Sequence, residues 1–217
     1  MITVEIYREI EGPDAQALAD VAGELMDIVF AHRAVRELLG SWPPGAPYGP
    51  DTTEARALWV AAVVSYARCF KGGIRTCGAA GSLVSLLRQS DQASHEYFLN
   101  LRDKHVAHSV SAFEQAKVGV GLGPAPDFEV IRVAPFESLT ILPNRETGEQ
   151  FERLVQDMQL LLVGRLDELG AVVLKDVQAM TTDNRARLPE LTITPALPTT
   201  DPKISRPRYR KRSRPKP

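Results

Sequence analysis

The sequence predicts a mainly α-helical bundle with a small antiparallel β insertion and a disordered basic C-terminal tail. Over long stretches before residue 110 and after residue 147, apolar residues recur at three- and four-residue spacing, which is the period of an amphipathic helix. Between about 117 and 142 the apolar residues instead alternate with glycine and are interrupted by proline, a pattern typical of short strands. The C-terminal end combines proline with lysine and arginine and has too few apolar residues to form a core.

Composition indicates one globular core. The chain has 217 residues, of which 44% are hydrophobic and 24% are charged. No apolar run approaches the roughly 20 residues that a membrane span needs, and the N-terminus lacks the basic and apolar regions of a secretory signal. We therefore expect a soluble cytoplasmic protein that does not bind membranes.

Cysteine and histidine are sparse. Cys69 and Cys77 are the two cysteines, and they do not form a Cys-x-x-Cys pair, so we expect both to be reduced. The four histidines and two cysteines are scattered rather than placed at metal-ligand spacing. The sequence therefore predicts neither a metal site nor a cofactor.

The charge distribution separates a body from a tail. The net charge is -1, yet residues 201–217 hold eight lysine or arginine residues and one aspartate, so the preceding residues are acidic overall. Proline together with like charges cannot form a packed core and should remain disordered. We expect a helical domain over residues 1–182, with the β insertion at about 117–142, and a Pro-rich basic tail over residues 183–217.

Helix boundaries follow from proline, glycine and capping residues. Pro13 suits the first turn of a helix, and Thr147 with Gln150 resembles a capping box. We expect a residue of the stretch 51–53 to cap the second helix, and Ser90 or Asp91 to cap the fourth. In chain order, the predicted helices cover about residues 13–40, 54–70, 80–89, 91–109 and 147–175, the last fading before residue 184.

The β insertion contains three strand-like segments, at 118–122, 128–133 and 139–142, so we expect a ribbon of two or three strands. Its Gly119-Val-Gly121-Leu-Gly123 stretch invites comparison with a phosphate-binding loop. It lacks a following lysine and a helix start, and it does not match the dinucleotide-binding fingerprint. A flexible or bulged strand is the interpretation that the residues favour.

Two histidines are assigned structural places. His32 lies on the apolar stripe of the first helix, where a histidine is usually a core residue with its hydrogen bonds satisfied. His95 falls in the first turns of the fourth helix, and we expect it to be exposed.

The end of the fourth helix gathers polar groups on its apolar stripe. At about 100° per residue, Phe98, Leu101, His105 and His108 share one face, and Arg102 lies about 60° from His105. Such groups are costly to bury unless they are paired or solvated. In a structural interpretation, the histidines cap the helix end and Arg102 pairs with a carboxylate. Spacing alone favours that interpretation.

A second interpretation is metal-free cleavage of RNA. A histidine with a pKa near ~6.5 can accept the proton of the 2′-hydroxyl or deliver one to the leaving oxygen. Arginine presents a permanently charged fork that stabilises the charge of the phosphate in the transition state. One histidine does not readily serve both steps, so a two-fold dimer that brings two such helices together would suit this chemistry.

Residues 101–109, Leu-Arg-Asp-Lys-His-Val-Ala-His-Ser, resemble the signature of the HEPN superfamily, in which an arginine precedes a histidine by four to six intervening residues. Here five residues intervene, and Asp103 is the polar residue that usually follows the arginine. The resemblance implies a compact, commonly dimeric helical bundle. It also implies that Arg102 and His108 form a catalytic pair supported by Asp103 and His105. The β insertion and the tail have no counterpart in this signature.

Many HEPN proteins are metal-independent ribonucleases of toxin–antitoxin or phage-defence systems, and others keep the fold without known catalysis. The resemblance therefore implies RNA as substrate, a homodimer, and an antitoxin or other partner protein. The alternative is a non-catalytic helical adaptor or nucleic-acid-binding protein in which the Arg/His cluster is structural and the tail binds nucleic acid or an acidic partner. We expect RNA phosphates to be contacted by basic residues of the motif and the tail, namely Lys104, Arg206, Arg208, Arg210, Lys211, Arg212 and Arg214.

Overall fold

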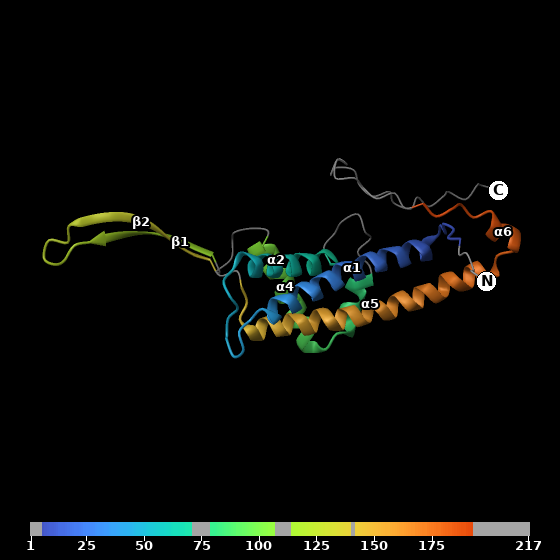
Figure 1. Ribbon diagram of the computed structural model, residues 1–217, viewed down its shortest axis with the longest axis horizontal. Coiled ribbons are helices and arrows are strands. Elements are labelled where there is room, and N and C mark those ends of the chain that lie inside the picture. The colour runs from blue at the N-terminus through green and yellow to red at the C-terminus, as the bar shows by residue number, and fades with distance from the viewer. Residues whose placement is uncertain (1–5, 71–78, 107–113, 140–141, 193–217) are drawn as a thin grey trace.

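The computed structural model describes residues 6–70, 79–106, 114–139 and 142–192. It is mainly helical, as predicted: a helical bundle continues at one end into a two-stranded ribbon and carries a short helix at the other (Figure 1). No helix within these ranges combines the length and apolar character of a membrane span. The elements are α1 (Pro13–Gly40), α2 (Thr53–Arg68), α3 (Ala79–Leu83), the 3-10 turn η1 (Val84–Leu86), α4 (Gln89–Leu101), the π-helical turn η2 (Arg102–Val106), β1 (Glu114–Leu122), β2 (Val130–Leu139), α5 (Arg145–Ala179) and α6 (Thr182–Ala186).

The two longest helices, α1 and α5, lie side by side and run antiparallel. The His32 Nδ1 atom is 2.9 Å from Gln159 Oε1, which confirms that its hydrogen-bonding capacity is used, but His32 is partly buried and not the core residue that was predicted. Nearer the other end of the pair, a Cβ atom added at Gly148 would lie 2.9 Å from Leu39 Cδ2. Glycine at this position therefore lets the two helices approach closely.

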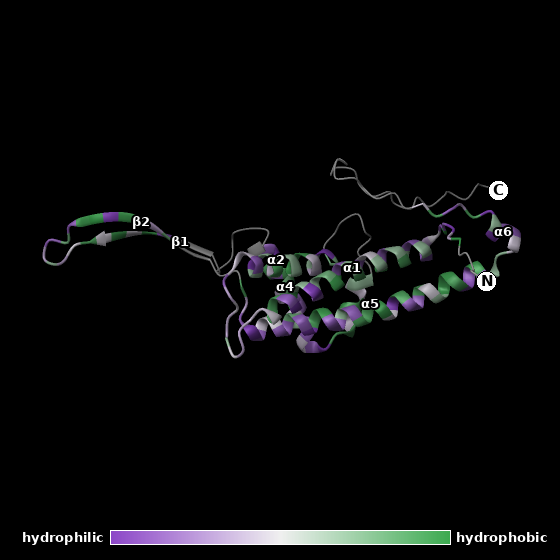
Figure 2. Ribbon diagram, viewed as in Figure 1, coloured by the Kyte–Doolittle hydropathy of each residue, from purple (hydrophilic) through white to green (hydrophobic). Residues whose placement is uncertain are grey.

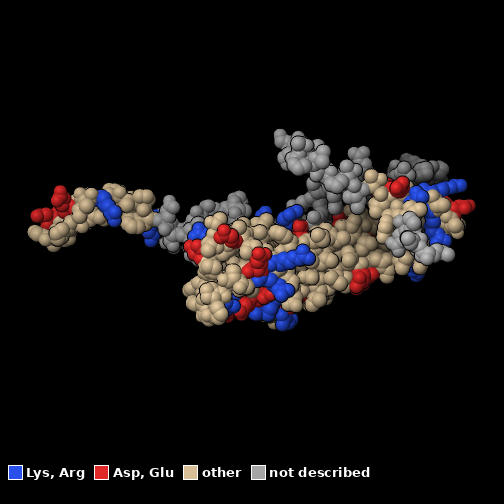
Figure 3. All heavy atoms as spheres, viewed as in Figure 1, with Lys and Arg blue, Asp and Glu red and all other residues tan. Residues whose placement is uncertain are grey.

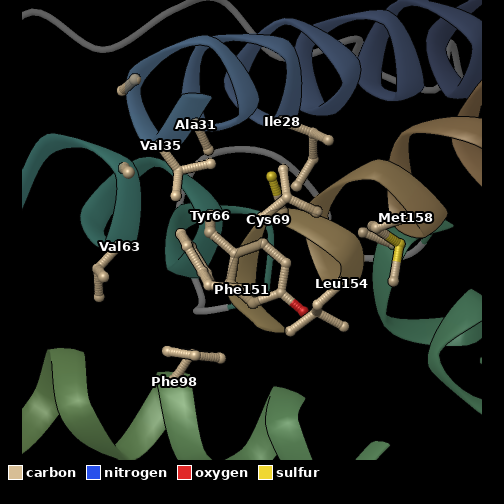
Figure 4. Close-up of a cluster of buried hydrophobic side chains, with 14 of the residues drawn as sticks. Ile28, Ala31, Val35, Val63, Tyr66, Cys69, Phe98, Phe151, Leu154 and Met158 are labelled. Atoms are coloured by element: carbon tan, nitrogen blue, oxygen red, sulfur yellow. The ribbon is translucent and has the colours of Figure 1, made fainter. Parts of the chain in front are cut away.

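An aromatic cluster joins three helices at the centre of the bundle. Trp59 and Tyr66 of α2, Phe98 of α4 and Phe151 of α5 are each less than 2% exposed. The ring of Phe151 lies 4.4 Å from that of Phe98 and 5.3 Å from that of Trp59, measured between centroids. Figure 4 shows aliphatic side chains of α1 closing the cluster from the opposite side. Burial of each large apolar side chain stabilises the fold by about 1.5–3 kcal/mol.

Helix caps agree with the prediction at α2 and differ from it at α5. Thr52 accepts a hydrogen bond from the backbone N–H of Ala55 at 3.2 Å, within the predicted capping stretch. At α5 the predicted capping box of Thr147 and Gln150 is wrong. Asn144 caps this helix by accepting from the N–H of Thr147 at 2.8 Å, because it stands three residues earlier in an extended conformation.

The short helical region before α4 is more broken than predicted. The expected third helix over 80–89 is divided into α3 and the 3-10 turn η1. The expected cap of the fourth helix by Ser90 or Asp91 is also wrong, since α4 begins at Gln89 and its N-cap residue, Arg88, makes no side-chain capping bond.

The ribbon consists of two strands, β1 and β2, paired antiparallel with Val120 opposite Val133. β2 starts at Val130 because Phe128 adopts a φ of 43° in the turn, so the predicted strand over 128–133 begins later than expected. The predicted third segment starts at Leu139, which is the last residue of β2. The register shifts between Gly121 and Leu122, which confirms the expected bulge in the glycine-rich strand.

The helical body extends past the predicted boundary at residue 182. Thr181 caps α6 by accepting from the N–H of Asn184 at 3.2 Å. Farther along, the N–H of Glu9 donates to the carbonyl of Pro189 at 2.8 Å, and the N–H of Leu191 donates to Tyr7 at 3.1 Å. Residues 183–192 are therefore joined to the N-terminal segment, and the rest of the predicted tail, 193–217, lies outside the described residues.

Candidate functional site

A buried polar layer positions α4 against its neighbours. His95 Nδ1 lies 2.8 Å from the hydroxyl oxygen of Tyr66, and its ring stacks edge-on against Phe70 with 4.5 Å between centroids. Gln150 of α5 donates to Ser94 Oγ at 2.6 Å. These contacts fix the rotation and register of α4 relative to α2 and α5, because a slip would leave buried polar atoms unpaired.

His95 corrects the sequence-based expectation. The predicted surface position of His95 is wrong, because the residue is 8% exposed. The buried stripe of α4 continues toward the N-terminus from Leu101 and Phe98 to Ser94, His95 and Asp91, at the usual spacing of three and four residues. Extending the stripe backwards from Phe98 would have identified these buried polar residues. Their partners Tyr66 and Gln150 come from distant parts of the chain and carry no such signal.

An ion-pair cluster closes the start of α4. Arg88 donates from Nε to Asp91 at 2.7 Å and from Nη2 to Asp157 of α5 at 2.9 Å. The hydrogen bond to Asp91, followed by the charges of both carboxylates, raises the pKa of the Arg88 guanidinium above its ordinary value. The start of α4 is thus attached electrostatically to α5.

Tyr66 is a neutral phenol within this buried polar layer. Burial, together with the charges of Cys69 and Asp91, raises the pKa of its hydroxyl far above the ordinary value. An ionised phenolate is therefore disfavoured at this place, so Tyr66 acts as a hydrogen-bond partner and not as a base.

The candidate catalytic arginine lies where α4 changes its winding. Leu101 is the last α-helical residue, and Arg102 begins the π-helical turn η2, which extends to Val106. Arg102 Nη1 donates to Asp103 Oδ1 at 3.0 Å, and the two side chains are 34% and 36% exposed. Lys104, next in the turn, is exposed.

The π-helical turn changes the predicted geometry of the motif. The prediction placed His105 and His108 on the stripe of Phe98 and Leu101 by assuming an α-helix up to about residue 109. A π-helix joins residues five apart and therefore turns less per residue than an α-helix, so the assumed angle of about 60° between Arg102 and His105 does not hold.

The structure describes part of the predicted site. It brings Arg102 and Asp103 together and exposes Lys104. His105 belongs to the π-helical turn, but its side chain is outside the described residues, as is the whole of His108. The predicted nucleic-acid contacts of the tail, Arg206, Arg208, Arg210, Lys211, Arg212 and Arg214, also lie outside the described residues.

The described part of the site offers an anion-binding group. The guanidinium of Arg102 has five N–H donors in a planar fork that matches the geometry of a phosphate group. Within the described residues, Asp103 alone pairs with this guanidinium. The same residues contain no group of three or more His, Cys, Asp or Glu side chains arranged to hold a metal ion.

Comparisons of the chain with protein-family models, with curated proteins and with solved structures gave no match.

Proposed function

We propose that this chain is a metal-independent endoribonuclease of the HEPN type, acting in a toxin–antitoxin or phage-defence system. Arg102 and His108 form the catalytic pair, and a cleft between two copies of the chain holds the RNA. The observation that carries this proposal is the π-helical turn that begins at Arg102, whose side chain is 34% exposed at the end of a packed helix.

The π-helical turn supports a functional role for this segment. π-Helical turns are rare, and those inside α-helices occur frequently at functional sites. The preceding helix is held by the Tyr66–His95 hydrogen bond and by the Gln150–Ser94 hydrogen bond. A group at the end of a well-anchored element is presented with the precision that catalysis requires.

Arg102 is suited to bind the phosphodiester. Its contact with Asp103 uses Nη1, which leaves further N–H donors of the fork for a ligand. The Asp103 carboxylate also restricts the rotamers of the long side chain, so less conformational entropy is lost when phosphate binds. Arg102 would then stabilise the additional negative charge that develops on the phosphoryl oxygens during cleavage.

In the proposed reaction, His108 accepts the proton of the 2′-hydroxyl while the 2′-oxygen attacks the phosphorus atom. The bond from phosphorus to the 5′-oxygen breaks, and that oxygen takes a proton from the His108 of the second copy. The products are a 2′,3′-cyclic phosphate and a 5′-hydroxyl end. His105 and Asp103 support the pair, and Lys104 with the basic tail contacts the RNA backbone.

The test is RNA cleavage by the purified chain in the presence of EDTA, followed by analysis of the product ends. Arg102→Ala and His108→Ala should each lower the cleavage rate by about 100-fold or more. Arg165→Ala is the matched control, because Arg165 is 43% exposed on α5 and pairs with Glu168 at 2.8 Å in a similar local ion pair. The control should cleave at the rate of the unmodified chain.

Far-UV circular dichroism must show that all variants keep the helical content of the unmodified chain. A folded, unmodified chain that leaves RNA intact would contradict the proposal. Equal cleavage by the Arg102→Ala variant and the Arg165→Ala control would also contradict it.

A second candidate function, a non-catalytic adaptor or nucleic-acid-binding protein, is favoured by the exposed apolar ribbon. Both strands contain large apolar residues that are more than half exposed, and Figure 2 shows the ribbon with its hydrophobic stretches extending away from the bundle. In that case the Arg102–Asp103 ion pair is structural, and the tail supplies the charge that binds a polyanion. Removal of residues 201–217 should then abolish RNA binding, whereas Arg102→Ala should leave binding unchanged.

A further inference from the structure

The β1–β2 ribbon extends from the bundle (Figure 1), and no described helix or strand packs on its faces. An isolated two-stranded hairpin is at best marginally stable in water, because each strand has one backbone partner and its faces remain solvated. Gly119, Gly121 and Gly123 add backbone entropy to the unfolded ribbon and contribute no side-chain packing. A ribbon of this composition requires a further packing partner.

Strand alternation gives the ribbon two different faces. Residues directly opposite each other in the register share a face, so Val120 and Val133 lie together, while Gly121 and Arg132 lie together on the other side. At the bulge, Val130 pairs with Leu122 and Ile131 is the additional residue next to it. We call one side the apolar face; it comprises Val118, Val120, Leu122, Val130, Ile131 and Val133.

The opposite face is covered by side chains of the ribbon itself. A Cβ atom added at Gly119 would fall 2.5 Å from Cε2 of Phe136, and one added at Gly121 would fall 3.2 Å from Cγ of Arg132. These two side chains therefore lie across the glycine backbone of β1. An aromatic ring over a strand glycine is a known means of stabilising a ribbon.

Among the described residues, no side chain covers the apolar face in this way. Its six residues are between 52% and 75% exposed, and together they present roughly 600 Å² of surface, at the upper end of the 300–600 Å² of the largest apolar patch on a typical monomer. If two such faces were joined, they would bury about 1,200 Å², at the lower end of the range of about 1,200–2,000 Å² for specific stable interfaces.

The charges of the ribbon disfavour an anionic partner. Residues 114–139 include two basic side chains, Lys117 and Arg132, and four acidic ones. Asp127 and Glu129 stand at the turn, and Figure 3 shows the acidic end of an otherwise largely uncharged ribbon. Nucleic acid or an anionic lipid surface would be repelled at this end. The six residues that define the apolar face are all uncharged, so the same six residues of a second copy can pack against them without burying a charge.

We propose that the ribbon is a dimerisation arm whose apolar face packs against the same face of a second copy of this chain. The two ribbons form a two-layer β sandwich about 10 Å thick, related by a two-fold axis near Val120 and Val133. The missing packing layer of each ribbon is thus supplied by its copy. This inference rests on the ribbon alone and is independent of RNA cleavage.

Sedimentation velocity over a protein concentration range from about 1 to about 100 µM tests this inference. The unmodified chain should be dimeric. In the triple variant Val118→Thr, Val120→Thr, Val133→Thr the dimer dissociation constant should rise at least about tenfold, because six methyl groups of the interface become hydroxyls while the β-branched shape is kept. The matched control, Lys117→Thr with Arg132→Thr on the opposite face, should dimerise like the unmodified chain.

Cross-linking tests the geometry. In a chain carrying Cys77→Ser, where the remaining Cys69 is buried, Val120→Cys should form covalent dimers under mild oxidation, and Arg132→Cys should not. The inference is overturned if the unmodified chain is monomeric at 100 µM, if the triple variant dimerises like the control, or if Arg132→Cys cross-links as fast as Val120→Cys. A further variant replaces residues 115–138 by a two-residue turn. The inference is also overturned if this variant dimerises with the original affinity. That result would not contradict the proposed RNA-binding cleft between two copies.

Discussion

Similar apolar residues are buried in the helical bundle and exposed in the β ribbon. Val63 and Phe151 of the bundle are fully buried, whereas Val120 and Phe136 of the ribbon are more than half exposed. Each central helix has neighbouring helices on several sides, so its apolar stripe is covered within the chain. A two-stranded ribbon has neighbours in the plane of the sheet alone. Hydropathy therefore shows which residues need burial. The number of packed layers of helices or sheets decides whether a single chain can bury them.

Polar groups also differ between the two regions, because those of the bundle are buried and paired while those of the ribbon edges face outward. In the bundle, His95 and Ser94 are buried and paired with side chains of neighbouring helices. In the ribbon, no strand of the described part of the chain pairs with the outer edges of β1 and β2. Buried hydrogen bonds thus define one arrangement of the helices in the bundle. The ribbon keeps exposed backbone edges and apolar side chains through which we infer that it associates with a second copy.

The largest expected difference between the two regions concerns core packing. Phe151→Ala should lower the free energy of unfolding by about 3–5 kcal/mol, because it removes the ring that contacts Phe98, Trp59 and Tyr66 and leaves a cavity. Val120→Ala in the ribbon should change the unfolding of the bundle by less than about 0.5 kcal/mol. Urea unfolding followed by far-UV circular dichroism, at concentrations where the chain is monomeric, measures both. Similar losses for the two variants would show that the ribbon and the bundle unfold as one cooperative unit.

A smaller effect is expected from the polar layer. Tyr66→Phe should cost about 1–3 kcal/mol, because it deprives buried His95 of its hydrogen bond to the phenol while keeping the ring. Tyr97→Phe is a useful comparison, since Tyr97 is 44% exposed. Equal stability of the two variants in urea unfolding would contradict a structural role for the Tyr66–His95 hydrogen bond.

Burial of Tyr66 should make the stability of the protein depend on pH in the alkaline range. Burial raises the pKa of Tyr66 in the folded protein above its ordinary value of 10.0. Above pH 10 the unfolded chain loses the phenolic proton while the folded chain keeps it. The contribution of this proton to the free energy of unfolding is therefore complete below pH 10 and declines as the pH rises. The decline is at most about 1.4 kcal/mol per pH unit. Tyr66→Phe should therefore lose less stability between pH 10 and 11 than the unmodified chain, and parallel losses would contradict the assignment.

The smallest predicted effect separates two glycines of α5. Gly164 has nothing within 4 Å of an added Cβ atom, so Gly164→Ala should raise stability by about 0.5–1 kcal/mol through helix propensity. Gly148→Ala should gain less or lose stability, because its Cβ atom would meet Leu39 at 2.9 Å. Thermal unfolding of both variants measures the difference. A larger gain for Gly148→Ala would mean that the contact between α1 and α5 is looser than the structure shows.

Local sequence was sufficient for the class and for most helices. Periodicity and the Pro13 and Gly40 boundaries predict α1 as it is found, and the capping stretch that includes Thr52 predicts the start of α2. The glycine-rich bulge at Gly121 was likewise readable. These features depend on backbone preferences and on residues a few positions apart, which are present in the linear sequence.

Competing local signals account for the wrong boundaries. Thr147 and Gln150 satisfy the pattern of a capping box, but Asn144 is an equally good cap and starts the helix earlier. Ser90 and Asp91 are good capping residues, yet Asp91 instead pairs with Arg88 and is buried. The choice between two acceptable caps depends on what the remaining residues contact in the folded protein.

Amphipathic helices, a glycine-rich ribbon between them, and the position of Arg102 near a helix end follow from the order of the residues. The burial of His95 against Tyr66, the π-helical turn at Arg102, and the exposure of one face of the ribbon among the described residues emerge when the helices pack together. Periodicity indicates which side chains need burial or a partner. The partner itself comes from a distant part of the chain, and for the ribbon we infer that it comes from a second copy.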